Sequence, residues 1–122
     1  MRRWLVTALV GLVSLPLIAQ AQEFKPPSNL KSSAMIAEGR AFFNLRCAGR
    51  CHGVDGQDGE FDSSSLSGKT YLDPPYVFAI LISGRRGSAM PSWQGRLSDD
   101  ELWKLIAFLS SLGDQARVAK GK

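Results

Sequence analysis

The chain has 122 residues, of which 44% are hydrophobic and 21% charged, a balance typical of one ordinary soluble domain. Two cysteines and one histidine are too few for a zinc site with four Cys or His ligands. The formal net charge of +4 is small and scattered along the sequence, which argues against a nucleic-acid-binding protein.

Residues 1–21 have the three parts of a secretory signal peptide. Arg2 and Arg3 give a positive start, an apolar run follows over residues 5–19, and Ala19-Gln20-Ala21 is a cleavage site of the small-x-small type. The apolar run is shorter than the ~20 residues that cross a bilayer as a helix, so an uncleaved membrane anchor is the less favoured alternative. We therefore predict cleavage after Ala21 and a mature protein in the periplasm, without stable membrane insertion.

The mature chain is predicted to begin with an extended lead-in over residues 22–32, where two adjacent prolines oppose regular structure. Ser32 or Ser33 then caps a helix that runs to about Cys47. Gly39, in the middle of this helix, costs roughly 1 kcal/mol relative to alanine. A glycine at such a position often indicates close contact with another helix.

The second predicted helix covers about residues 75–83. Asp73 caps it, proline occupies its first turn and Gly84 ends it. The flanking segments, residues 53–73 and 84–97, show no regular pattern, although connections above ~12–15 residues are uncommon in compact domains. Because three short helices also make a thin core, we expect a further group to fill the centre and hold these loops.

The third predicted helix has the clearest signals. Ser98 and Glu101 form a capping box, and an apolar stripe at helical spacing follows. We expect Gly113 to end this helix and residues 114–122 to form a frayed C-terminal tail. No stretch alternates as a strand, so the predicted fold class is all-α, with one domain over residues 33–113.

Both cysteines and the only histidine of the chain lie in one run, Cys47-Ala48-Gly49-Arg50-Cys51-His52. Two thiols can add across the vinyl groups of a porphyrin, and a histidine directly after the second thiol is then held against one face of the iron. This is the chemistry of covalent haem attachment, usually written C-x-x-C-H, although three residues separate the cysteines here. The alternative is a plain disulfide in a haem-free exported protein.

Met90 is the candidate ligand for the opposite face of the iron. It lies in the second long loop, and a thioether ligand raises the potential of a histidine-bound iron. Met1 is lost with the signal peptide. Met35 lies on the helix that leads directly into the cysteines, so it is badly placed for the opposite face.

These motifs, in this order, resemble those of the class I c-type cytochromes over about residues 33–112. Gly39, Phe43 and Cys47 are similar to the family's first helix, where a glycine and an aromatic residue precede the first haem cysteine. Ala89-Met90-Pro91 resembles its methionine loop, and the residues from Leu97 to Leu109 resemble its last helix.

The resemblance implies an all-α fold around one covalently attached haem c, in which the first and last helices cross with Gly39 against Phe108. It implies that four residues bind the haem: Cys47, Cys51, His52 and Met90. His52 and Met90 would be the iron ligands.

Two features depart from the family pattern. The C-x-x-x-C-H spacing adds a residue to the attachment loop, and Gly49 is the residue suited to accommodate it. The family usually has a glycine-proline after the haem histidine, whose carbonyl orients the ring, but residues 53–70 contain no proline. The acceptor for His52 is therefore not identified by the sequence.

The resemblance implies a periplasmic electron carrier that passes single electrons between redox proteins such as a dehydrogenase, an oxidase or another cytochrome. An iron bound by both His52 and Met90 has no open position for substrate, which argues against an enzyme. Two alternatives stay open: a haem subunit dedicated to one dehydrogenase, and a five-coordinate haem enzyme or sensor in which Met90 is not a ligand.

Overall fold

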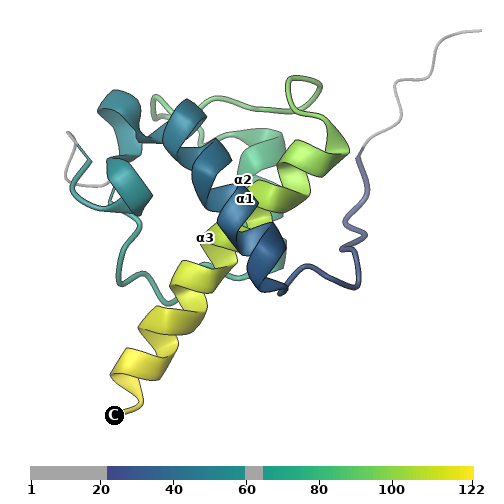
Figure 1. Ribbon diagram of the computed structural model, residues 1–122. Helices are drawn as coiled ribbons and strands as arrows, with labels where there is room; N and C mark the ends of the chain where they lie inside the picture. Colours follow the sequence, from purple (N-terminus) through teal and green to yellow (C-terminus); the bar gives the residue numbers. More distant parts are fainter. Residues whose placement is uncertain (1–21, 60–64) are drawn as a thin grey trace, which may run out of the picture.

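A computed structural model describes residues 22–59 and 65–122 (Figure 1), so the predicted signal peptide over residues 1–21 lies outside the described residues. In chain order the elements are α1 (Ser33–Phe43), the π-helical segment η1 (Asn44–His52), the short 3₁₀ turn η2 (Val54–Gly56), α2 (Pro74–Ser83) and α3 (Asp99–Lys120). The described part of the chain contains no strand, which confirms the all-α prediction.

The helix starts predicted from capping residues are confirmed. The side chains of Ser32 and Asp73 each accept a backbone N–H from three residues ahead, at 3.2 Å and 2.9 Å. At the start of α3, Ser98 Oγ accepts the Glu101 N–H at 3.2 Å, and the Glu101 carboxylate accepts the Ser98 N–H at 2.9 Å. In the first turn of each helix, where backbone N–H groups have no partner within the helix, a local side chain thus accepts one of them.

Helices α1 and α3 cross at the centre of the molecule (Figure 1), and they pack on each other more extensively than any other pair of described elements. Gly39 permits the crossing, since a Cβ built there would lie 1.9 Å from the Lys104 carbonyl oxygen and 3.0 Å from Phe108 Cβ. Beside this contact the rings of Phe43 and Phe108 lie 5.2 Å apart between centroids. The predicted contact of Gly39 with Phe108 is therefore confirmed.

The predicted end of the third helix at Gly113 is wrong, because α3 continues to Lys120. Gly113 is buried, and a Cβ built on it would lie 2.0 Å from the Leu72 carbonyl oxygen. This glycine therefore lets the loop before α2 approach the helix closely and does not end the helix. The prediction of a frayed tail fails for the same reason over the residues that α3 includes.

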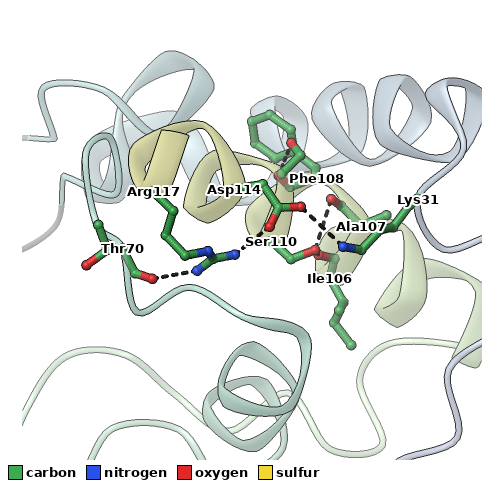
Figure 2. Close-up of polar contacts among 9 residues, drawn as sticks. Lys31, Thr70, Ile106, Ala107, Phe108, Ser110, Asp114 and Arg117 are labelled. Carbon is green, nitrogen blue, oxygen red and sulfur yellow. Dashed lines mark hydrogen bonds and ion pairs between the residues drawn. The ribbon is translucent and has the colours of Figure 1, made fainter. Parts of the chain in front are cut away.

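Polar contacts hold the C-terminal half of α3 to the rest of the chain (Figure 2). Arg117 donates to the Thr70 carbonyl and to the Asp114 carboxylate, both at 2.5 Å. Lys31, in the lead-in, lies 3.6 Å from Asp114. The helix thus joins the segment before α1 to the loop before α2.

The core is a single cluster in which the largest fully buried side chains are Phe43, Leu105 and Ile106. The first long loop was expected to have no regular structure, which is wrong at η2, while residues 84–97 have turns only. None of the helices in the described ranges is long and apolar enough to cross a membrane.

Candidate functional site

The three residues of the predicted attachment motif lie together in η1, which continues directly from α1. Cys47 and Cys51 are within this segment, and His52 is its last residue. The Gly53 N–H donates to the Ala48 carbonyl at 2.9 Å, a bond that spans five residues where an α-helix spans four. A turn of this width holds one more residue. It closes across Gly49, whose backbone angles are not helical, and so accommodates the additional residue of the C-x-x-x-C-H spacing.

Gly49 is the point where the attachment segment departs from helical geometry. Its φ and ψ are 8° and −121°, and a Cβ built on it would meet nothing within 4 Å. The local change of direction in η1 therefore occurs at Gly49, the residue that we expected to accommodate the additional residue of the motif.

Neither cysteine forms a disulfide, so both keep the free thiol that haem attachment requires. Cys47 is half-buried and Cys51 is exposed. Burial, followed by the proximity of Cys51, raises the pKa of the Cys47 thiol to about 11. The Cys47 sulfur is therefore a protonated thiol at neutral pH.

His52 is half-buried and lies against the core. Its ring centroid is 6.0 Å from that of Phe43, which is itself only 1% exposed and packs on Phe108. The crossing of α1 and α3 thus supports the side of η1 that carries the histidine.

The loop that carries Met90 is held on both sides of this residue. The Met90 carbonyl accepts the Arg85 N–H at 3.0 Å, which closes the turn before it. After it, Ser92 Oγ and the Trp93 N–H donate to carbonyls in the last turn of α2, at 2.5 Å and 2.8 Å. These bonds give partners to two carbonyl groups in the last turn of α2, and they also fix the backbone around Met90.

Gly84 allows this loop to fold back onto α2. Its φ is 69°, in the region that favours glycine, and a Cβ there would lie 2.6 Å from the Ser92 nitrogen and 2.9 Å from the Met90 carbonyl oxygen. The Met90 side chain is half-buried and packs against the same core cluster as Cys47. Met35, on α1, also packs against that cluster.

The loop that carries Met90 also contains a buried N–H group that bears on whether these residues could hold a haem. Trp93 Nε1 is buried and has no hydrogen-bond partner within the described residues. An unpaired buried N–H costs about 1–3 kcal/mol, and the propionates of a haem are acceptors that could satisfy it. Two free thiols, an imidazole, a thioether and an unpaired N–H form a donor set that fits a covalently bound haem.

Sequence reasoning missed a cluster of three polar residues next to the attachment segment. Arg40 and Asn44, one helical turn apart, both bond to Asp55 in η2. Hydrogen bonds from Arg40 and then Asn44 lower the pKa of Asp55 to about 2. The spacing of Arg40 and Asn44 puts them on one face of a helix, but nothing in the sequence pairs that face with Asp55.

Comparison with known proteins identifies relatives of this chain. The family model described as cytochrome c oxidase, cbb3-type, subunit III matches residues 34–109, a range that includes every residue predicted to bind a haem. The lupanine 17-hydroxylase [cytochrome c] of a Pseudomonas species is 31% identical over 108 residues, which cover 88% of this chain. The chain spans only 15% of the length of that relative. No solved structure gives a significant match.

Proposed function

The chain belongs to the class I c-type cytochromes, in the family described as cytochrome c oxidase, cbb3-type, subunit III, and we propose that it is a periplasmic carrier of single electrons. Membership of this family supports a haem-based role in electron transfer. The observation that carries the more specific proposal is the attachment segment η1, in which two free thiols precede a half-buried histidine.

In this proposal Cys47 and Cys51 would hold one haem c through thioethers, and His52 and Met90 would be the ligands of its iron. When bound, the haem supplies a one-electron couple between ferric and ferrous iron. The protein's own task is to keep both ligands in place during the exchange. The packing of His52 on Phe43 and the bonds around Met90 support that task.

The same ligand set argues that the protein does not act as an enzyme at the iron. With His52 and Met90 both bound, no position is open for a substrate. The proposed partners are therefore a donor and an acceptor among redox proteins, such as a dehydrogenase, an oxidase or another cytochrome. Contact with them needs no covalent step and no stable membrane insertion.

Replacement of Met90 tests the ligand assignment. Met90→Ala should lower the reduction potential and let the reduced protein bind carbon monoxide, because the sixth position opens. The control is Met35→Leu, a near volume-conserving change in a residue packed on the core, which should change neither property.

Visible spectra of the oxidised and reduced proteins, with and without carbon monoxide, give both readouts. If the unmodified reduced protein binds carbon monoxide readily and Met90→Ala changes neither spectrum nor potential, Met90 is not a ligand. The five-coordinate enzyme or sensor would then replace the electron carrier.

The periplasmic location rests on the cleavage site in residues 19–21. We propose that the mature chain begins at Gln22, whose side chain donates to Asp99 at the start of α3 at 2.8 Å. Cell fractionation and mapping of the N-terminal peptide test this proposal. Recovery of the apolar run in the native protein, together with sedimentation in the membrane fraction, would indicate an anchor instead.

A second candidate function is a haem subunit dedicated to one dehydrogenase or hydroxylase. One observation favours it: the relative is named both as a lupanine 17-hydroxylase and as a cytochrome c, and this chain matches only a small part of it. Co-purification of the native protein distinguishes the two. A stoichiometric enzyme partner that reduces it directly indicates a dedicated subunit, whereas reduction by several unrelated donors indicates a free carrier.

A further inference from the structure

We propose that Arg40, Asn44 and Asp55 form a clamp that positions the His52 imidazole by fixing the backbone that follows it. The inference rests on the proposed function, in which His52 is an iron ligand. The three residues act through Gly53 and Val54, which connect His52 to Asp55 in η2, so they are positioning residues.

The clamp joins one face of the helical segment to the loop through four hydrogen bonds. Arg40 donates to the Asp55 carboxylate from Nε at 2.7 Å and also from Nη2. Asn44 Nδ2 donates to the same carboxylate at 2.7 Å, and the Asp55 backbone N–H donates back to Asn44 Oδ1 at 2.8 Å. A planar guanidinium and an amide thus hold both the side chain and the backbone of Asp55.

The backbone held by the clamp has an uncommon conformation. Asp55 has a φ of 56°, and its neighbours Gly53 and Gly56 have φ values of 71° and 75°. A Cβ on Gly53 would lie 1.6 Å from the Gln57 carbonyl oxygen, so the turn is also tightly closed. A non-glycine residue at such a φ persists when its surroundings over-determine it, and the bonds of Asp55 provide that constraint.

The clamp lies close enough to His52 to control its backbone. His52 is three residues before Asp55, and the intervening segment contains no proline to fix it. The Gly53 N–H, directly after His52, bonds to the Ala48 carbonyl at 2.9 Å. The backbone that follows His52 is therefore fixed at two successive points, first by this bond at Gly53 and then by the clamp at Asp55. Loss of the second point loosens the segment that leads out of His52 and so changes the orientation of its ring.

The effect of the clamp on His52 can be distinguished from its effect on the stability of the whole fold. The Arg40 side chain is 59% exposed and the Asp55 side chain 20% exposed, so this ion pair contributes less to folding than the buried core does. The core depends instead on the crossing of α1 and α3. Loss of the clamp should therefore change the ligand geometry more than the resistance to unfolding.

The test uses the full-length protein, produced with haem maturation, and three variants. Asn44→Ala removes two of the four bonds without changing any charge, and Arg40→Lys keeps the positive charge but loses the planar fork. Glu38→Gln is the matched control, since Glu38 is also on α1, is 58% exposed and pairs with Lys104 at 2.8 Å, away from the loop.

Hydrogen exchange measures the clamp itself, with or without haem. In Asn44→Ala the Asp55 amide should exchange roughly tenfold faster, because it loses its acceptor. Proton NMR of the oxidised haem protein measures the effect on the ligand, since the spread of the haem methyl resonances follows the orientation of the axial imidazole. This spread should change in Asn44→Ala, change less in Arg40→Lys and stay constant in Glu38→Gln.

The outcomes separate the two proposals. An unmodified protein without covalent haem overturns the proposed function, while exchange at Asp55 still reports whether the clamp exists. A haem protein in which Asn44→Ala speeds exchange but leaves the methyl resonances unchanged overturns the positioning role. Unchanged exchange at Asp55 in that variant overturns the clamp altogether.

Discussion

Gly39→Ala is the sharpest test of the helix crossing, because two physical effects predict opposite signs. By helix propensity alone, alanine in the middle of α1 should stabilise the protein by about 1 kcal/mol. In the structure, the new Cβ would lie 1.9 Å from the Lys104 carbonyl oxygen, a distance that real contacts do not reach. The obstacle is backbone, so no side-chain rotation relieves it, and α1 and α3 must separate by more than 1 Å.

The expected net effect is destabilising. Overpacking of a tight core costs about 1–3 kcal/mol, and a clash with backbone belongs at the upper end of that range. Subtracting the propensity gain of about 1 kcal/mol leaves a loss of about 2 kcal/mol, or roughly 10 °C in the melting temperature of a domain of this size.

Urea unfolding of the haem protein measures this effect. The control is Ala37→Gly on the exposed face of α1, which should cost about 1 kcal/mol and so calibrates the propensity term within the same helix. If Gly39→Ala raises or leaves unchanged the free energy of unfolding, the close contact between α1 and α3 does not exist as described.

Three further predictions concern the attachment segment, the clamp and the buried glycine of α3. Mass spectrometry of the denatured protein should show the polypeptide plus one haem, and Cys47→Ala or Cys51→Ala should leave a single thioether or no haem; an unmodified chain with no added mass would contradict covalent attachment. The pKa of Asp55 is about 2 in the folded protein and lies near 4 in an unfolded chain, so its stabilising contribution is complete above pH 4 and is lost as the pH falls through 2. Acid unfolding should therefore show that Asp55→Asn is less stable than the unmodified protein at pH 6 and that the difference closes by pH 2, whereas a constant difference would mean that its charge is not involved. Gly113→Ala should destabilise the protein, because its Cβ would lie 2.0 Å from the Leu72 carbonyl oxygen, and a gain in thermal stability would refute that contact.

The sequence was sufficient for those elements that depend on neighbouring residues alone. The capping side chains of Ser32, Asp73 and Ser98 act within three residues along the chain, so their patterns predicted where the three α-helices of the described residues begin. The role of Gly39 was also predictable, although only because its spacing to Phe43 and Cys47 resembled a known family. Propensity alone would have made this glycine an unexplained cost.

Other features could not be predicted because they depend on what lies nearby in space. Gly113 has the sequence signature of a helix end, and only the approach of the Leu72 carbonyl shows that it is a contact glycine. Arg40 and Asp55 are 15 residues apart, and they meet only because the loop after His52 turns back through positive φ values. For the candidate haem ligands, residue chemistry and order along the chain were informative, but the bonds that fix the loop around Met90 were not.

The one-residue insertion in the attachment motif connects these observations. An additional residue between two cysteines on a regular helix would rotate every later side chain by about 100°, and His52 would then face away from its place beside Phe43. The structure avoids this rotation by leaving helical geometry at Gly49, so that the bond from Gly53 to the Ala48 carbonyl closes a widened turn of five residues. A widened turn is less constrained than an α-helical one, and at its C-terminal end Gly53 leads directly into the short 3₁₀ turn η2, which contains Asp55. We infer that the clamp on Asp55 supplies the missing constraint, so the unusual cysteine spacing and the polar cluster three residues later are two parts of one solution for holding the histidine.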